Sequence, residues 1–297
     1  MERLEPIYLK RESFDMLKKH EIGHGTDGGV YRIGDGQLIK IYHKRIKTID
    51  ELEITDDSDM KFYNKDTIVH KFDKEPITYF RYSDEDIKIR SKDAIFRAIE
   101  RQESITRTHL PKNVVYINGH FAGCVLQYIK GIQIHKLHFL PLSKRKQIMK
   151  EVLISVKELL DNYIYHVDLS NSPYSKKLFI NNEGVTEHLG HSHVLVNPFT
   201  LKPNIIDLDG KSTVYMEHYS SDYEELCMYN LSVLLIEFLL GLNTDDYDFE
   251  FNEFEKLASD LSDMGIEKEF IDNLSKYELK IDQAFDLVDS IKTLRRV

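Results

Sequence analysis

The stretch GHGTDGGVYRIGDGQLIKIY, residues 23–42, joins a glycine-rich loop to two runs of strand-forming residues. Val30 to Ile33 and Gln37 to Tyr42 are the two runs, and Gly34-Asp35-Gly36 between them is a hairpin turn signal. The stretch therefore predicts a strand, a tight turn and a second strand directly after the glycines.

The glycines have the spacing GxGxxGxV, formed by Gly23, Gly25, Gly28 and Val30. In a dinucleotide-binding unit such a loop opens a helix, whose N-terminus holds the pyrophosphate. Here a strand follows, which favours the other known use of the pattern, a flap that closes over the phosphates of a nucleotide. A glycine-rich hairpin without a ligand is the alternative.

Lys40 lies inside the second apolar run, twelve residues beyond Gly28. Alternate residues of a strand share a face, so Leu38 and Lys40 point to the same side. A single lysine in a strand is commonly a solvated edge residue. Because this one directly follows the predicted flap, we expect it to contact phosphates.

The rest of the chain predicts an α+β protein with two lobes, a β-rich lobe over residues 1–128 and a mainly helical lobe over residues 129–297. A polar stretch over residues 44–90 has little periodicity and looks like an insertion. The remaining expected elements are a helix over 92–108, strands over 114–117 and 124–129, a helix that Ser143 can cap and that runs to Asp161, strands over 193–196 and 204–208, and a buried helix over 222–240.

Composition narrows the class of protein. The chain has 297 residues with 40 Lys and Arg against 50 Asp and Glu, a net charge of −10, which argues against a general nucleic-acid binder. No apolar run approaches the roughly 20 residues that cross a bilayer, so no membrane span is expected. Two cysteines are too few for a disulfide framework, and with no secretory signal in the first residues we expect a cytoplasmic protein.

Two short motifs in the second half carry chemistry. His166-Val167-Asp168-Leu169 directly follows the long helix that ends near Asp161, and Ile205-Ile206-Asp207-Leu208-Asp209-Gly210 follows a predicted hairpin. Together with the glycine-rich loop and Lys40, these residues resemble the protein-kinase-like superfamily, including its bacterial relatives such as the aminoglycoside phosphotransferases. The resemblance covers most of the chain outside residues 44–90 and the last forty residues.

The resemblance implies a bilobal kinase-like fold that uses ATP and Mg²⁺. Lys40 would grip the α- and β-phosphates, Glu100 would pair with Lys40, with Glu103 as the alternative, and backbone groups from Gln127 to Ile129 would bind adenine. In the second lobe, Asp168 would accept the proton of the acceptor hydroxyl, and Asp207 would hold the metal ion.

Several positions depart from the family pattern. Leu38 replaces the usual alanine, Val167 replaces arginine, and Cys227 replaces the aspartate that braces the catalytic loop. The metal-binding asparagine is absent at its usual distance from Asp168; an insertion over 171–192 places His193 in its position, with Asn171 as an alternative. Because imidazole suits Mn²⁺ better than Mg²⁺, His193 favours manganese.

Three functions remain open at this point. The first is a protein Ser/Thr kinase-like phosphotransferase, and the second is a small-molecule kinase, which the short segment after Gly210 favours. The third is a pseudokinase that serves as a binding module. His191 and His193 share one face of a strand and also permit a structural zinc site, but no cysteine pair completes four ligands.

Overall fold

The computed structural model describes residues 5–24, 28–34, 36–42, 60–64, 67–72, 75–80, 92, 94–170, 178–181, 184–187, 192–209, 213–241, 254–275 and 279–291. The chain is a mixed α+β protein, as predicted. It divides into two compact units. Unit 1 comprises Met1–Ile99, Pro111–Tyr128 and Lys177–His188, and unit 2 comprises Glu100–Leu110, Ile129–Lys176 and Leu189–Val297.

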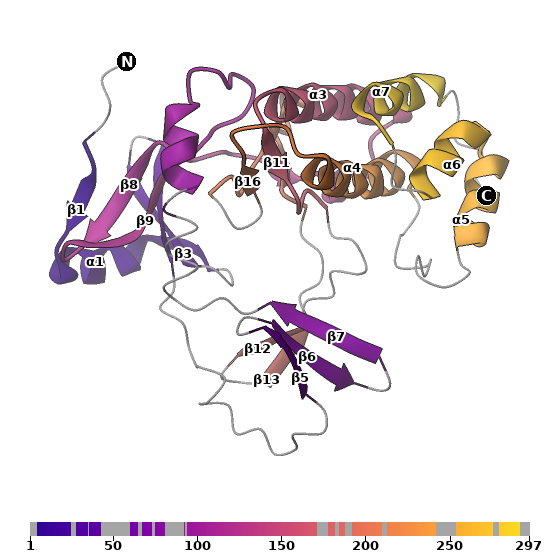
Figure 1. The fold of residues 1–297 in the computed structure, drawn as a ribbon. Helices are drawn as coiled ribbons and strands as arrows, with labels where there is room; N and C mark the ends of the chain where they lie inside the picture. The colour runs from indigo at the N-terminus through magenta and orange to yellow at the C-terminus, as the bar shows by residue number, and fades with distance from the viewer. Residues whose placement is uncertain are drawn as a thin grey trace. The chain divides into compact units, whose positions relative to one another are not determined.

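Unit 1 is built on a six-stranded sheet with the order β1-β8-β9-β4-β3-β2 (Figure 1). β1 pairs in parallel with β8, and the other neighbours are antiparallel. The strands are β1 (Ile7–Leu9), β2 (Glu21–His24), β3 (Gly28–Gly34), β4 (Gln37–Tyr42), β8 (Asn113–Ile117) and β9 (His120–Gln127). The strand–turn–strand expected after the glycines is therefore confirmed.

Alternation along β4 separates the two faces of this sheet. Ile39 and Ile41 belong to a core that includes Phe14 and Leu17 from α1 (Arg11–Leu17). Tyr42, on the other face, packs with Ile95 of the helix over residues 94–100. Lys40, which by alternation lies on the Tyr42 face, is only 7% exposed.

One expected helix is shorter in the structure. The helix expected over 92–108 ends at residue 100. Further along the expected range, the carboxylate of Glu158 accepts hydrogen bonds from the backbone of Thr106 and Arg107, each at 2.9 Å, and from the Thr106 hydroxyl. These bonds fasten the segment to α3 (Leu142–Asp161) instead of extending the helix.

The two insertions also contain regular structure. Residues 44–90, whose sequence has little periodicity, hold the antiparallel sheet β5 (Met60–Asn64), β6 (Thr67–Phe72) and β7 (Glu75–Phe80). Residues 171–192 hold the hairpin β12 (Leu178–Asn181) and β13 (Gly184–Glu187). Each chain segment pairs with its sequence neighbour, so these sheets form from local contacts.

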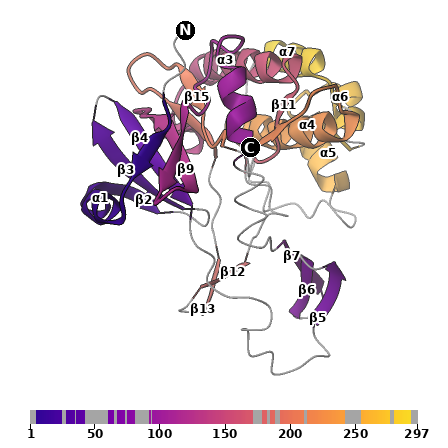
Figure 2. The same ribbon diagram turned by 60° about the vertical axis from the view of Figure 1, so that its left-hand side comes forward.

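Unit 2 is organised around α3, which packs against β11, β15, η6 and α7. Figures 1 and 2 both show α7 lying alongside α3. Ser143 lies within α3 and does not cap it, because the helix begins one residue earlier, after Pro141. The other helices are η4 (Ile134–Leu137), α4 (Ser221–Leu235), η6 (Ile236–Leu240), α5 (Phe254–Asp263), α6 (Lys268–Ser275) and α7 (Ile281–Ser290). One sheet has three strands, β10 (Ile132–Gln133), β14 (Val194–Val196) and β15 (Pro203–Ile205). A second sheet has two strands, β11 (Ile164–His166) and β16 (Thr213–Tyr215).

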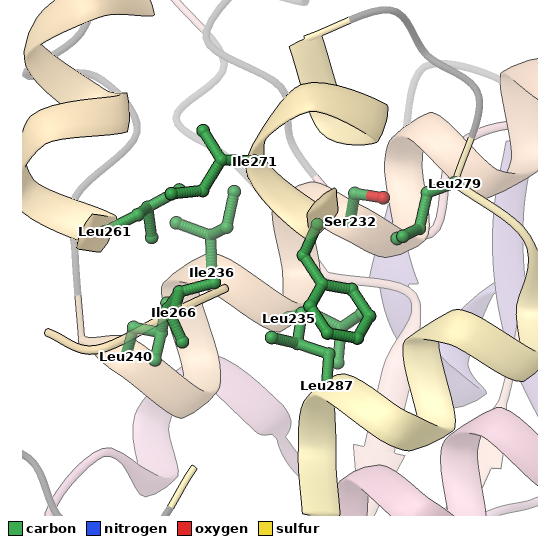
Figure 3. A pocket seen from close by; sticks show the side chains of 10 residues that line it. Ser232, Leu235, Ile236, Leu240, Leu261, Ile266, Ile271, Leu279 and Leu287 are labelled. Atoms are coloured by element: carbon green, nitrogen blue, oxygen red, sulfur yellow. The ribbon is translucent and has the colours of Figure 1, made fainter. Parts of the chain in front are cut away.

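The C-terminal helices enclose a small cavity of about 20 Å³ (Figure 3). Its lining is apolar except for Ser232, whose hydroxyl already donates to the carbonyl of Met228 at 2.7 Å. A cavity of this size can admit one water but offers it too few polar partners. It is therefore a packing void. Of the helices that the structure describes, none has the length and apolar character needed to span a membrane.

Candidate functional site

The candidate site in unit 2 is formed by the loop after β11 and the loop after β15. The first carries Asp168 and the second carries Asp207, and His193, just before β14, lies close to both carboxylates. Nδ1 of His193 is 3.8 Å from Oδ2 of Asp168, and Nε2 is 3.8 Å from Oδ2 of Asp207. The structure thus brings together three residues that lie up to 39 positions apart in sequence.

Backbone hydrogen bonds hold this arrangement in place. The His193 N–H donates to the carbonyl of Leu169 at 3.1 Å, and the Ile206 N–H donates to the carbonyl of His193 at 2.8 Å. The His193 ring also contacts the carbonyl of Asp168 through Nδ1. A carbonyl only accepts, so Nδ1 carries the proton, and in the neutral ring Nε2 presents a lone pair toward Asp207.

The same geometry fits a divalent cation. The carboxylate of Asp207 and the Nε2 lone pair of His193 are both metal-ligand groups. Their 3.8 Å separation is less than about 4.2 Å, twice a typical bond length of about 2.1 Å, so both atoms can contact one ion. The structure supplies two such ligands here, and among the residues it describes no group of three or more His, Cys, Asp or Glu side chains could hold a metal.

Asp207 itself has an unusual backbone. Its φ of 65° lies in the left-handed region, which non-glycine residues adopt rarely and which is associated with functional sites. Residues of β16, which the sequence did not single out, support the loop: the Thr213 hydroxyl donates to the Asp207 carbonyl at 3.1 Å, and the Tyr215 hydroxyl donates to the Leu208 carbonyl at 2.6 Å. Nothing in the local pattern of residues 213–215 signals this role.

His166 lies beneath the site and is completely buried. Its Nε2 contacts the Ile206 carbonyl at 2.9 Å, while its Nδ1 accepts the Asp168 N–H at 3.3 Å, which requires the neutral tautomer with the proton on Nε2. Burial, followed by the neighbouring His193, lowers the pKa of His166 to about 4. His166 therefore links the Asp168 loop to the Asp207 loop as a neutral group.

Cys227 of α4 contacts the backbone at His166, where the Asp168 loop begins. Its thiol is fully buried and accepts a hydrogen bond from the backbone N–H of His166, and burial raises its pKa to about 12. The family resemblance assigns an aspartate to this position. A neutral thiol that accepts one backbone N–H provides the bracing contact without burying a charge.

In unit 1, the glycine-rich segment joins antiparallel β2 and β3. Gly25 lies outside the described residues, and Gly23 and Val30 are paired across the two strands. Gly28 has a steric reason to be glycine, because a Cβ there would lie 2.2 Å from the carbonyl oxygen of Ile41. A Cβ on Gly23 would meet nothing within 4 Å, so packing does not require this glycine.

Lys40 is in the middle of the sheet, between Val30 of β3 and Cys124 of β9. Its Nζ lies 5.9 Å from the centre of the Tyr42 ring. Glu100 is exposed at the last residue of the helix over 94–100, in unit 2. The expected pairing of Lys40 with Glu100 or Glu103 stays a prediction, and Asn171 and His191 lie outside the described residues.

The predicted adenine-binding segment has a defined hydrogen-bond pattern. The Tyr128 N–H donates to the Gly36 carbonyl at 2.6 Å, and the Gln127 side-chain amide donates to the same oxygen at 2.9 Å. Along an antiparallel strand, successive residues direct their backbone N–H and C=O groups alternately toward one neighbouring strand and away from it. The Tyr128 N–H is thus used within the sheet, and the Gln127 backbone points away from β4.

Comparison with known proteins adds no family assignment. Neither the models of known protein families nor the curated proteins include a match to this sequence.

Proposed function

We propose that this protein is an ATP-dependent phosphotransferase of the protein-kinase-like fold, with a β-rich and a helical lobe. The observation that carries the proposal is the position of His193, whose two ring nitrogens each lie 3.8 Å from a carboxylate oxygen, one of Asp168 and one of Asp207. A base for a hydroxyl proton and a ligand for a phosphate-bound cation are the two groups that phosphoryl transfer needs close together.

In the proposed reaction, Asp168 accepts the proton of the acceptor hydroxyl and orients its oxygen for in-line attack on the γ-phosphorus. The bond between the γ-phosphorus and the β,γ-bridging oxygen breaks, and ADP leaves. A bound Mg²⁺ or Mn²⁺ would neutralise charge on the β- and γ-phosphates. Asp207 and His193 would hold that ion, and Lys40 with the glycine-rich loop of residues 23–28 would hold the phosphates.

The first experiment measures nucleotide binding and phosphoryl transfer with γ-labelled ATP. Wild type is compared with Asp168→Asn and Asp207→Asn, which keep side-chain volume, and with Asp222→Asn as a matched control in the exposed first turn of α4. We expect ATP with metal to raise the Tm of wild type and the control, and label transfer to fall at least 100-fold in both site variants. Failure of ATP to shift the Tm with either metal would contradict the proposal.

The same measurements separate the alternative functions. A Tm shift without label transfer indicates a pseudokinase. Transfer to the chain itself or to a general protein acceptor indicates a protein kinase, whereas transfer only to small hydroxyl compounds indicates a small-molecule kinase.

His193 provides a test of metal choice. Because imidazole nitrogen favours Mn²⁺ over Mg²⁺, we expect wild type to bind ATP more tightly with Mn²⁺, and His193→Asn, which supplies an amide oxygen, to reduce that preference. Equal affinity with both metals in wild type would contradict the assignment of His193 as a ligand.

A further inference from the structure

Charge is distributed unevenly along this acidic chain. Residues 104–150 contain no Asp or Glu, although a segment of 47 residues at the average composition of the chain would contain about eight. Residues 188–206 also contain none. The first segment carries several lysines and the second carries Lys202, so both contribute only positive charge to a protein whose net charge is −10.

The small sheet β10-β14-β15 places these two segments side by side. Ile132 of β10 is paired with Val196 of β14. A Cβ added to Gly131 would lie 2.9 Å from the Leu195 Cβ. The chain just before β10 therefore runs close to β14. Lys130, two residues before Ile132, therefore lies beside the turn between β14 and β15. Lys202 lies across that turn, since its carbonyl accepts the Asn197 N–H at 3.0 Å.

The turn itself is well ordered by hydrogen bonds. The Asn197 side-chain oxygen accepts the backbone N–H of Phe199 at 2.9 Å and of Thr200 at 3.1 Å, and the Asn197 carbonyl accepts the Leu201 N–H at 2.8 Å. Phe199, at the tip, is 86% exposed, the highest value among the large apolar side chains described. The hydrogen bonds thus hold a phenyl ring in water, where its exposure has a free-energy cost.

Two lysines belong to the segments that meet at this turn. Lys130 and Lys202 are exposed, and within the described part of the chain neither takes part in an ion pair. Ile132 adds a further exposed apolar side chain next to the turn. We call Lys130, Ile132, Phe199 and Lys202 the hairpin surface.

We propose that the hairpin surface binds the face of an anionic phospholipid bilayer. Phe199 and Ile132 would enter the boundary between headgroups and acyl chains, while Lys130 and Lys202 would contact lipid phosphates. A single-stranded nucleic acid fits less well, because its bases stack on successive aromatic rings along a groove, and no ring contact of Phe199 is found among the described residues. The proposal does not depend on phosphotransferase activity.

The test is co-sedimentation of the full chain with vesicles of phosphatidylcholine alone or mixed with phosphatidylglycerol. We expect binding to the anionic vesicles that weakens as salt is raised. Lys130→Gln and Lys202→Gln should each lower the partition coefficient about five-fold, and Phe199→Ala about ten-fold.

Matched controls lie elsewhere on unit 2. Lys268→Gln makes the same charge change on α6, and Tyr219→Ala removes an exposed ring next to α4, so neither should alter binding. A fluorescent oligothymidylate is tested in parallel. Absence of binding to anionic vesicles, binding that the hairpin variants leave unchanged, or binding to the oligonucleotide alone would each overturn the proposal.

Discussion

His166 is a buried ring whose two nitrogens both contact backbone groups, so its protonation state affects how the Asp168 loop is held. In the folded protein its pKa is about 4, below the ordinary value of 6.5 that it has in the unfolded chain. Between these two values the unfolded chain binds a proton that the folded protein does not. The free energy of unfolding is therefore not reduced by His166 above pH 6.5, and it decreases as the pH falls from 6.5 toward 4.

We expect this effect to reach about 3 kcal/mol of unfolding free energy by pH 4, since each unit of pKa difference corresponds to about 1.4 kcal/mol. His166→Gln can still donate to the Ile206 carbonyl but does not titrate, so its free energy of unfolding should fall less between pH 7 and pH 4. Denaturant unfolding at a series of pH values measures this, with the exposed His120→Gln as control. In wild type, an NMR titration of His166 with a midpoint near pH 6.5 would contradict the prediction.

Cys227 has a buried thiol, which we expect to react slowly with alkylating reagents. The thiolate is the form of cysteine that reacts with alkylating reagents, and burial raises the pKa of Cys227 to about 12. Cys124 is also completely buried, on β9. At pH 8 we expect iodoacetamide to modify neither cysteine in the native protein and both after unfolding, as mass spectrometry would show. Rapid alkylation of Cys227 in the native state would show that the thiol is neither buried nor bonded to the loop.

Among the elements, β4 is constrained by its neighbours on both sides. A Cβ on Gly123 of β9 would lie 1.9 Å from the carbonyl oxygen of Lys40, and a Cβ on Gly28 of β3 would lie 2.2 Å from that of Ile41. Both contacts are to backbone atoms, which cannot rotate away. Gly23, by contrast, has open space around its Cβ position, so any need for glycine there comes from something other than packing.

We therefore expect Gly123→Ala and Gly28→Ala each to lower the free energy of unfolding by about 1–3 kcal/mol, through displacement of β4. Gly23→Ala should change it by less than about 0.5 kcal/mol. Denaturant unfolding of the three variants makes the comparison, and a fully stable Gly123→Ala would show that the strands do not approach this closely. Because we expect Gly23→Ala to keep the fold, this variant also tests the proposed nucleotide binding without a loss of structure.

At the level of the whole molecule, local patterns predicted the elements that local forces determine. The two strands around Gly34-Asp35-Gly36 and the long helices α3 and α4 were predicted because hydrophobic periodicity and turn residues act within a few positions. The helix over 94–100 was predicted too long: Thr106 and Arg107, inside the expected range, hydrogen-bond to Glu158, more than fifty residues away. Residues 44–90 have little periodicity in sequence, and no element was predicted there, although they contain β5, β6 and β7.

The sequence by itself determined an α+β chain, the strand, turn and strand that directly follow the glycine-rich loop, and the candidate residues Asp168, His193 and Asp207. Only the tertiary structure decided that His193 lies close to both aspartates, that Thr213 and Tyr215 support the Asp207 loop, and that Cys227 bonds to the backbone of His166. The physical reason is range: periodicity and turn chemistry act between near neighbours, whereas these contacts form only when packing around α3 brings distant segments together.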